Sequence, residues 1–227
     1  AERGIGVGPD SKAYICFMFD WVKYCVVGCG PDGAPLAGEY LKDKVPGRGD
    51  YPKDLNSAII GTMPQAAGGI RVDWQGNIYV GMLLHPEGFK VPEGQDKMVW
   101  QYMVGGVVKF PPAGGCVEGE DGMMRGTKAK NMLGYYPGLG PLSSAGFTSN
   151  PCCVCRGARF DLDRWGRIVV PNAVANNVRL YDNAGNLILE FGKYGNFDSL
   201  YGNPNTDKGK KGEPTVAADD VPLTWPT

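Results

Sequence analysis

The alternation of apolar and polar residues repeats three times along the chain in the same form. Residues 160–170 read FDLDRWGRIVV, residues 70–80 read IRVDWQGNIYV, and residues 5–15 read IGVGPDSKAYI. The three segments align without a gap, and each predicts an alternating strand, a tight turn and a second strand. Because a recurring supersecondary unit is typical of repeat architectures, the sequence predicts a fold built from copies of one β unit.

The third copy continues into the most complete unit of the chain. Four short strands are predicted at residues 158–163, 167–171, 177–182 and 186–191. The last two are joined by Asn-Ala-Gly-Asn at 183–186, where Gly and Asn accept the positive φ that a tight hairpin needs. Four strands per repeat is the blade of a β-propeller, so we expect an all-β fold.

The first two copies give less complete blades, because long stretches without periodicity follow them. Residues 24–29 predict a third strand of the first blade, and residues 36–41 a candidate outer strand. Residues 106–110 predict a third strand of the second blade. A helical turn is expected within residues 54–60.

These assignments define the expected domain organisation. A propeller region over residues 1–200 contains three blades at about 1–41, 66–110 and 157–197, with Gly- and Pro-rich insertions at 42–65 and 111–156 and an extended tail at 201–227. Loops of this length are usually functional or face a partner.

The blades resemble the NHL-repeat family of β-propellers. The third blade carries an Asp after the inner strand, Gly-Arg-Ile-Val-Val at 166–170, an Asn pair, Val-Arg-Leu-Tyr-Asp at 178–182 and Phe-Gly at 191–192. The resemblance is specific over about 66–83 and 157–197. The blades and the long loops together are also similar to propeller modules of large secreted bacterial proteins, some of which carry haem modules.

The resemblance implies a ring of four-stranded blades. The number of blades predicted from the sequence is smaller than a closed ring requires. Propellers close with about 4–8 blades, whereas three blades are predicted here. Residues 222–227, PLTWPT, are similar to the lead-in to another NHL repeat. We therefore expect either a longer protein or a second protein chain to complete the propeller.

Composition narrows the classes of function. The chain has 23 Lys and Arg against 24 Asp and Glu, a formal net charge of -1, which argues against nucleic acid or an anionic membrane as the main partner. No apolar stretch approaches the roughly 20 residues that cross a bilayer. Residues 1–4 lack the features of a signal peptide, so we expect a processed terminus or the edge of a fragment.

The seven cysteines suit an oxidising compartment, so a secreted or cell-envelope location is expected. Cys152 and Cys155 form a C-x-x-C pair, but the next residue is Arg156 rather than the His of a haem-attachment motif. The favoured interpretation is structural disulfides, with one bond between Cys25 and Cys29 and another that involves the 152–155 group.

A zinc site is the alternative use of these thiols, since tetrahedral zinc needs four ligands. Besides the 152–155 group, the further ligands would come from Cys25 and Cys29, or from Cys16 and Cys116. His85 is the only histidine. It cannot supply the several His ligands of zinc-dependent propeller lyases, and we interpret it as a loop residue available for contact with a partner.

Two carboxylates recur at one repeat position, namely Asp73 and Asp163. Propeller lactonases of the gluconolactonase-like group bind calcium in the central channel through Glu, Asn and Asp, and Asn172, Asn176 and Asn177 could imitate part of that set. The favoured interpretation is structural, because an Asp after a strand caps a turn by accepting backbone N–H bonds. A catalytic residue need occur only once.

Trp74 and Trp165 lie in the turns between the first and second strands of the second and third blades. Exposed aromatic side chains among polar neighbours favour contact with a protein or a carbohydrate. The other interpretation, left open here, is that both rings pack beneath the long insertions.

The resulting hypothesis is a non-catalytic propeller scaffold, or protein-interaction module, of a larger secreted or envelope assembly. It assigns no catalytic or cofactor-binding residue. One alternative is a lactonase-like propeller hydrolase or lyase with a divalent ion, Ca or Zn, in its channel. Another is a subunit of a haem-containing redox complex.

Overall fold

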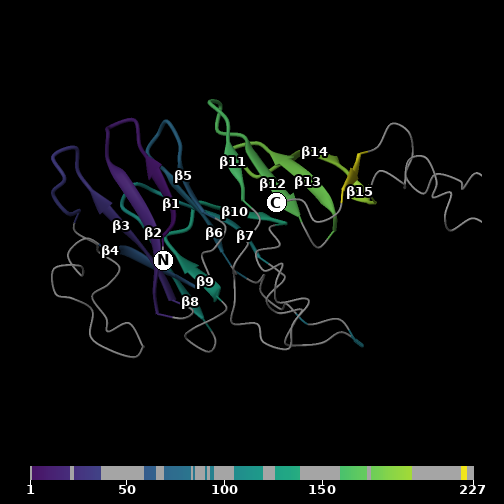
Figure 1. Cartoon of the computed structure of the whole chain (residues 1–227), viewed down its shortest axis with the longest axis horizontal. Coiled ribbons are helices and arrows are strands. Elements are labelled where there is room, and N and C mark those ends of the chain that lie inside the picture. The colour runs from purple at the N-terminus through teal and green to yellow at the C-terminus, as the bar shows by residue number, and fades with distance from the viewer. Residues whose placement is uncertain are drawn as a thin grey trace, which may run out of the picture.

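The larger β-sheets of the protein are antiparallel and stack side by side (Figure 1). The computed structural model describes residues 2–20, 23–36, 59–64, 69–82, 84, 90, 93–94, 105–119, 126–138, 159–172, 175–195 and 221–223. Within these residues the regular secondary structure consists of β-strands. No helix among them is long and apolar enough to cross a membrane. The predicted all-β, propeller-type fold class is confirmed.

Three four-stranded sheets correspond to the three sequence repeats. The first contains β1 (Glu2–Val7), β2 (Ala13–Asp20), β3 (Lys23–Cys29) and β4 (Ile59–Pro64). The second contains β5 (Ile70–Val72), β6 (Ile78–Met82), β7 (Gly106–Phe110) and β10 (Gly134–Pro137). The third contains β11 (Asp161–Leu162), β12 (Ile168–Asn172), β13 (Asn177–Tyr181) and β14 (Leu187–Phe191). Neighbours within each sheet are antiparallel and follow chain order, which is the meander of a propeller blade.

Two smaller sheets accompany the blades. The hairpin of β8 (Cys116–Gly119) and β9 (Gly126–Lys130) lies between β7 and β10 in the sequence, and β8 contacts β4 of the first blade. A short parallel pair joins β15 (Lys193–Tyr194) to β16 (Pro222–Leu223).

The outer strands of the first two blades differ from the sequence prediction. In the first blade the fourth strand is β4, which falls in the expected insertion 42–65 and replaces the end of the helical turn expected at 54–60. The outer strand expected at 36–41 lies, from residue 37 onward, outside the described residues. In the second blade the fourth strand is β10, inside the expected insertion 111–156.

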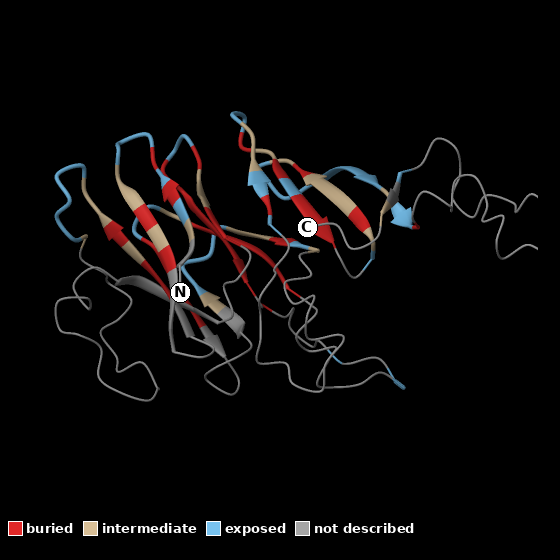
Figure 2. Ribbon diagram, in the orientation of Figure 1, coloured by how far each residue is buried: buried red, intermediate tan, exposed pale blue. Residues whose placement is uncertain are grey.

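The sheets pack face to face, and the second sheet is buried on both sides. Every residue of β6 and β7 is buried, as the red ribbon in Figure 2 shows. Successive side chains of a strand point to opposite faces. Val80 therefore packs in a core with Tyr14 of the first sheet, whereas Tyr79 packs in a core with Ile168 of the third.

The first strands of the three blades lie next to one another, β1 against β5 and β5 against β11. Glycines allow the closest of these approaches. A Cβ atom at Gly6 would lie 2.9 Å from Val72 Cγ2, and one at Gly4 would lie 3.2 Å from the backbone nitrogen of Ile70. This adjacency of first strands is the arrangement expected around a propeller axis.

Substitution of Gly106, in the centre of the second blade, should destabilise the fold. A Cβ there would lie 2.6 Å from the carbonyl oxygen of Tyr136, so Gly106→Ala should lower the free energy of unfolding by about 1–3 kcal/mol. Gly134→Ala on β10 is the matched control, because its nearest contact is the Tyr136 hydroxyl at 3.3 Å. Urea denaturation measures both, and equal stabilities would contradict the close packing of β7 on β10.

Candidate functional site

The turns that close β1–β2, β5–β6 and β11–β12 lie at the same end of the molecule (Figure 1). An aspartate organises two of them. In the second blade, Asp73 Oδ1 accepts hydrogen bonds from the backbone nitrogens of Gln75 and Asn77, each at 2.9 Å. Gly76 completes the turn with φ of 83°, a conformation that favours glycine.

The same turn recurs in the third blade. Asp163 Oδ1 accepts from the backbone nitrogens of Trp165 and Arg167, each at 2.9 Å. Asp182, between β13 and β14, accepts from Ala184 and Asn186 at 2.9 and 2.8 Å. The recurring carboxylates therefore cap turns, as the structural interpretation of the sequence predicted.

Asp73 also anchors a buried polar cluster inside the second blade. Its Oδ2 accepts from the Tyr79 hydroxyl at 3.1 Å and from Asn77 Nδ2 at 2.9 Å, and Lys109 Nζ lies 3.7 Å away. Asp73 is 7% exposed and Lys109 is 8% exposed. Burial, and then the negative charge of Asp73, raises the pKa of Tyr79 far above its ordinary value, so the phenol remains a hydrogen-bond donor.

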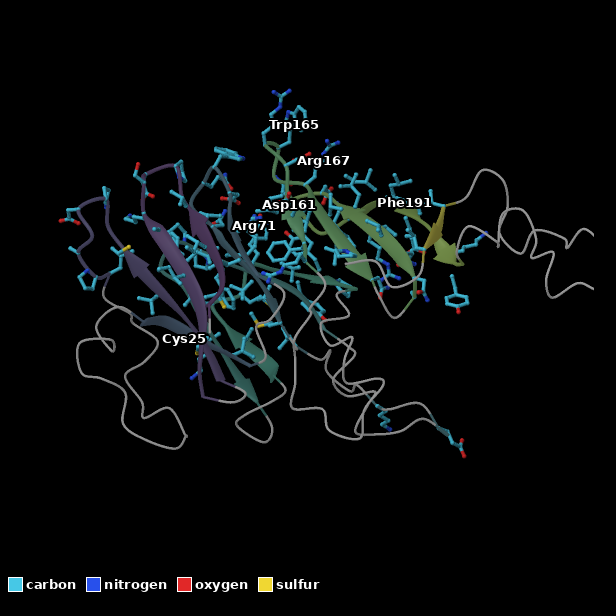
Figure 3. The ribbon with its side chains drawn as sticks, in the orientation of Figure 1. Cys25, Arg71, Asp161, Trp165, Arg167 and Phe191 are labelled. Carbon is cyan, nitrogen blue, oxygen red and sulfur yellow. The ribbon has the colours of Figure 1, made fainter. Side chains whose placement is uncertain are left out.

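The turn of the third blade carries an exposed aromatic ring between two arginines. The guanidinium carbons of Arg164 and Arg167 lie 4.1 and 5.0 Å from the ring centroid of Trp165. Arg167 Nε also donates to Asp163 Oδ2 at 2.6 Å. Trp165 is 57% exposed, and Figure 3 shows it at the tip of its turn.

Trp74, in the equivalent turn of the second blade, is 63% exposed. We call the four residues Trp74, Arg164, Trp165 and Arg167 the turn-end patch. Both tryptophans are exposed, so their availability for contact stays a prediction. Most of the insertions that the alternative interpretation placed over the rings lie outside the described residues. The arginines were missed, although the segment Asp-Arg-Trp-Gly-Arg places one on each side of Trp165.

An ion pair joins the inner strands of the second and third blades. Arg71 Nε donates to Asp161 Oδ1 at 2.8 Å, and Figure 3 shows the two side chains together. This hydrogen bond holds the pKa of Asp161 below its ordinary value. Burial alone would raise the pKa of Asp163, but hydrogen bonds from Arg167 and the turn backbone outweigh it and lower that pKa as well.

The disulfide expected between Cys25 and Cys29 is not present. Both carry free thiols, and they lie on β3 four residues apart, which separates their Cα atoms by roughly 13 Å in an extended strand. A disulfide requires Cα atoms within about 7 Å. Burial raises the pKa of the Cys25 thiol, so this thiol stays protonated and unreactive at neutral pH. Cys152, Cys155 and His85 lie outside the described residues.

The asparagines considered as calcium ligands lie away from the turn-end carboxylates. Asn172 and Asn177 pair at the far end of the β12–β13 hairpin, roughly 16 Å along the strand from the turn that Asp163 caps. The buried Oδ1 of Asn177 has no hydrogen-bond partner. Across the part of the chain that the structure describes, no group of three or more His, Cys, Asp or Glu side chains converges as metal ligands.

The described sheets define an all-β protein of the propeller type. No family model matches the chain, and no curated protein matches it. Among 25 matching chains of known structure is a gluconolactonase of Xanthomonas campestris, described as important in glucose secondary metabolic pathways. The identity is 14% and the TM-score 0.31, and the match covers 82% of this chain but 60% of that one. At this TM-score the likeness carries no inference about activity.

Removal of the two equivalent aspartates should have unequal effects. Asp73→Ala leaves Lys109, which is 8% exposed, without its carboxylate, and loss of one partner of a buried ion pair costs about 3–5 kcal/mol. Asp163→Ala should cost a fraction of this, because the Arg167 side chain is 43% exposed and can be solvated. Chemical denaturation compares them, and equal losses would contradict the distinction.

Acid should destabilise the protein through Asp161 and Asp163. Their pKa values are lower in the folded protein than the ordinary 3.8, so the unfolded chain binds these protons more readily. The stability they contribute is complete above the unfolded pKa and is lost as the pH falls through the folded pKa. We expect the urea concentration at the unfolding midpoint to decrease as the pH is lowered below about 4. In Asp161→Asn this decrease with pH should be less steep. An identical pH dependence in that variant would contradict the effect of Arg71.

Proposed function

We propose that this chain is a non-catalytic propeller module, of the NHL-repeat type, that binds a protein partner through the turn-end patch within a larger secreted or envelope assembly. The observation that carries the proposal is Trp165, which is more than half exposed on a capped turn, with the guanidinium carbons of Arg164 and Arg167 4.1 and 5.0 Å from its ring centroid. Trp74 offers a second exposed ring on the equivalent turn of the neighbouring blade.

The chemistry of the patch suits a protein interface. Tryptophan and arginine are enriched among the residues that contribute most to binding energy at interfaces. The cation–π contacts and the Asp163 hydrogen bonds restrict Trp165 and Arg167 before any partner arrives. Less conformational entropy is then lost on binding.

The charge of the patch also indicates the chemistry of the partner. Arg164 and Arg167 add positive charge beside an apolar ring, while Asp163 neutralises part of it. A partner surface that combines an apolar or aromatic side chain with a carboxylate would match, since guanidinium groups bind carboxylates in a bidentate manner.

The recurring aspartates support the non-catalytic part of the proposal. The Oδ1 atoms of Asp73, Asp163 and Asp182 each accept two backbone hydrogen bonds. These atoms stabilise the turns, and their repetition in successive hairpins is the pattern of a structural element.

The second candidate is a lactonase-like propeller hydrolase or lyase with a divalent ion in its channel. Among the described residues, Asp161 is the best candidate ligand for such an ion, because it lies on the inner strand β11 and its side chain is 71% exposed. However, Arg71 occupies one of its oxygens, and the described asparagines do not converge on it. Among the residues that the structure describes, no set of side chains fits such an ion.

The haem-subunit alternative came from the number of cysteines and the family resemblance. Cys152 and Cys155, the pair considered for haem attachment, lie outside the described residues. The C-x-x-C pair is followed by Arg156, so the residues do not fit covalent haem attachment.

Crosslinking followed by affinity measurement tests the proposed interface. A photo-crosslinking residue at position 165, introduced in the producing organism, should capture one discrete protein that mass spectrometry identifies. With that partner purified, Trp165→Ala should raise the dissociation constant by about 10-fold or more, and Trp74→Ala combined with it should raise the constant further.

Tyr194→Ala is the matched control, because Tyr194 is 73% exposed and lies beyond the opposite end of β14. Its affinity should stay within about twofold of wild type. An unchanged affinity in the Trp74→Ala, Trp165→Ala double variant would reject the patch. Metal-dependent lactone hydrolysis by the purified wild type would favour the second candidate.

A further inference from the structure

The two outermost sheet faces of the three-blade stack are apolar and exposed. On the first blade, Ile5 and Val7 of β1 are 56% and 62% exposed. On the third blade, Val169 is 38%, Leu189 50% and Phe191 40% exposed. Register places these three side chains on one face, because Val169 and Leu189 both pair with Leu180, and Phe191 pairs with Val178 two residues away. Figure 2 shows β14 exposed, and Figure 3 shows Phe191 at its end.

The residues at the first position of the three repeats show that the face of the first blade lacks a neighbouring blade among the described residues. Ile5, Ile70 and Phe160 occupy this position in the three repeats. Ile70 is 0% exposed because it packs against the first blade, and Phe160 is 2% exposed because it packs against the second. Ile5 is the residue at this position with no described blade before it, and it is 56% exposed.

The residues at the tenth position of the repeats show that the opposite face of the third blade also lacks a neighbouring blade among the described residues. Tyr14, Tyr79 and Val169 are equivalent in the alignment of the repeats. Tyr14 is 1% exposed in the core shared with the second blade, and Tyr79 is 0% exposed in the core shared with the third. Val169 has no described blade after it and is 38% exposed.

The exposed faces are therefore the two halves of one interface that the chain already forms twice. Between the first and second blades, Tyr14 and Ile70 meet in one core, and between the second and third, Tyr79 and Phe160 meet in the other. The equivalent pair at the open ends is Val169 and Ile5. One chain carries both halves, so two copies can satisfy each other without any further surface.

We propose that a second copy of this chain covers both faces, so that the third blade of each copy packs on the first blade of the other. The three described blades of each of two chains give six, within the roughly 4–8 blades of closed propellers. A two-fold axis relates the copies and generates the same interface twice. The inference rests on the propeller architecture of the proposed function and not on the turn-end patch.

The molecular mass of the purified full chain gives the first test. Native mass spectrometry and sedimentation equilibrium should report twice the 24.4 kDa of one chain. A folded species of 24.4 kDa would overturn the proposal and indicate that blades of another polypeptide, or of a longer form of this one, cover the faces. An open-ended series of higher masses would overturn ring closure.

Opposite charges at the two faces give the second test. Ile5→Lys and Val169→Glu each place a charge in both interfaces of a symmetric dimer, and each should raise the dimer dissociation constant by about 100-fold or more. Both sites are exposed in the single chain, so the circular dichroism spectrum should not change. Mixed in equal amounts, the variants should dimerise again. Their complex has one unaltered interface and one in which the ammonium meets the carboxylate.

Leu133→Glu is the control for a charge at an exposed apolar residue away from these faces, since Leu133 is 56% exposed in the turn before β10, and this variant should remain dimeric. Dimers that persist in both single variants, or a mixture that stays monomeric, would overturn the proposed interface. Because Trp165 lies on neither face, crosslinking from position 165 distinguishes failure of the ring from failure of the turn-end patch.

Discussion

The structure depends on the burial of the second sheet on both of its faces. Its central strands, β6 and β7, have no exposed residue, and alternate side chains enter the cores on either side. Burying a large apolar side chain contributes about 1.5–3 kcal/mol, so the second sheet is stabilised chiefly by its neighbours. The first and third sheets each share one core with it, which fixes their order.

Hydrogen bonds across the core between the second and third sheets make the packing of these two sheets specific. The Tyr136 hydroxyl donates to the carbonyl of Asn183 at 3.1 Å, and the Tyr181 hydroxyl donates to the carbonyl of Pro137 at 2.7 Å. These bonds run in opposite directions between the second and third blades. They satisfy phenols that would otherwise be buried without a partner, which is costly. Register between the blades is thus defined by hydrogen bonds as well as by apolar contact.

Rigid packing gives the turn-end patch its geometry. The strands fix where each turn begins, and the capping aspartates fix the path of the backbone through it. Trp165 and its two arginines are therefore presented on a capped turn between paired strands. The carboxylates that the sequence left open as calcium ligands serve this scaffold, and the candidate binding residues are their neighbours in the chain.

Local features of the sequence determined three strands of the third blade and its turns, whereas the first strand, predicted at 158–163, is the shorter β11. The predicted strands 167–171, 177–182 and 186–191 agree with β12, β13 and β14 to within one residue at each end, because short hairpins depend on alternation and turn residues alone. Only the tertiary structure decided that β4 and β10, far from their partners in the chain, complete the first two blades, and that Cys25 is a buried free thiol. It also decided that Trp74 and Trp165 are exposed. Long-range pairing and exposure depend on which distant segments cover a residue, and no local pattern specifies that.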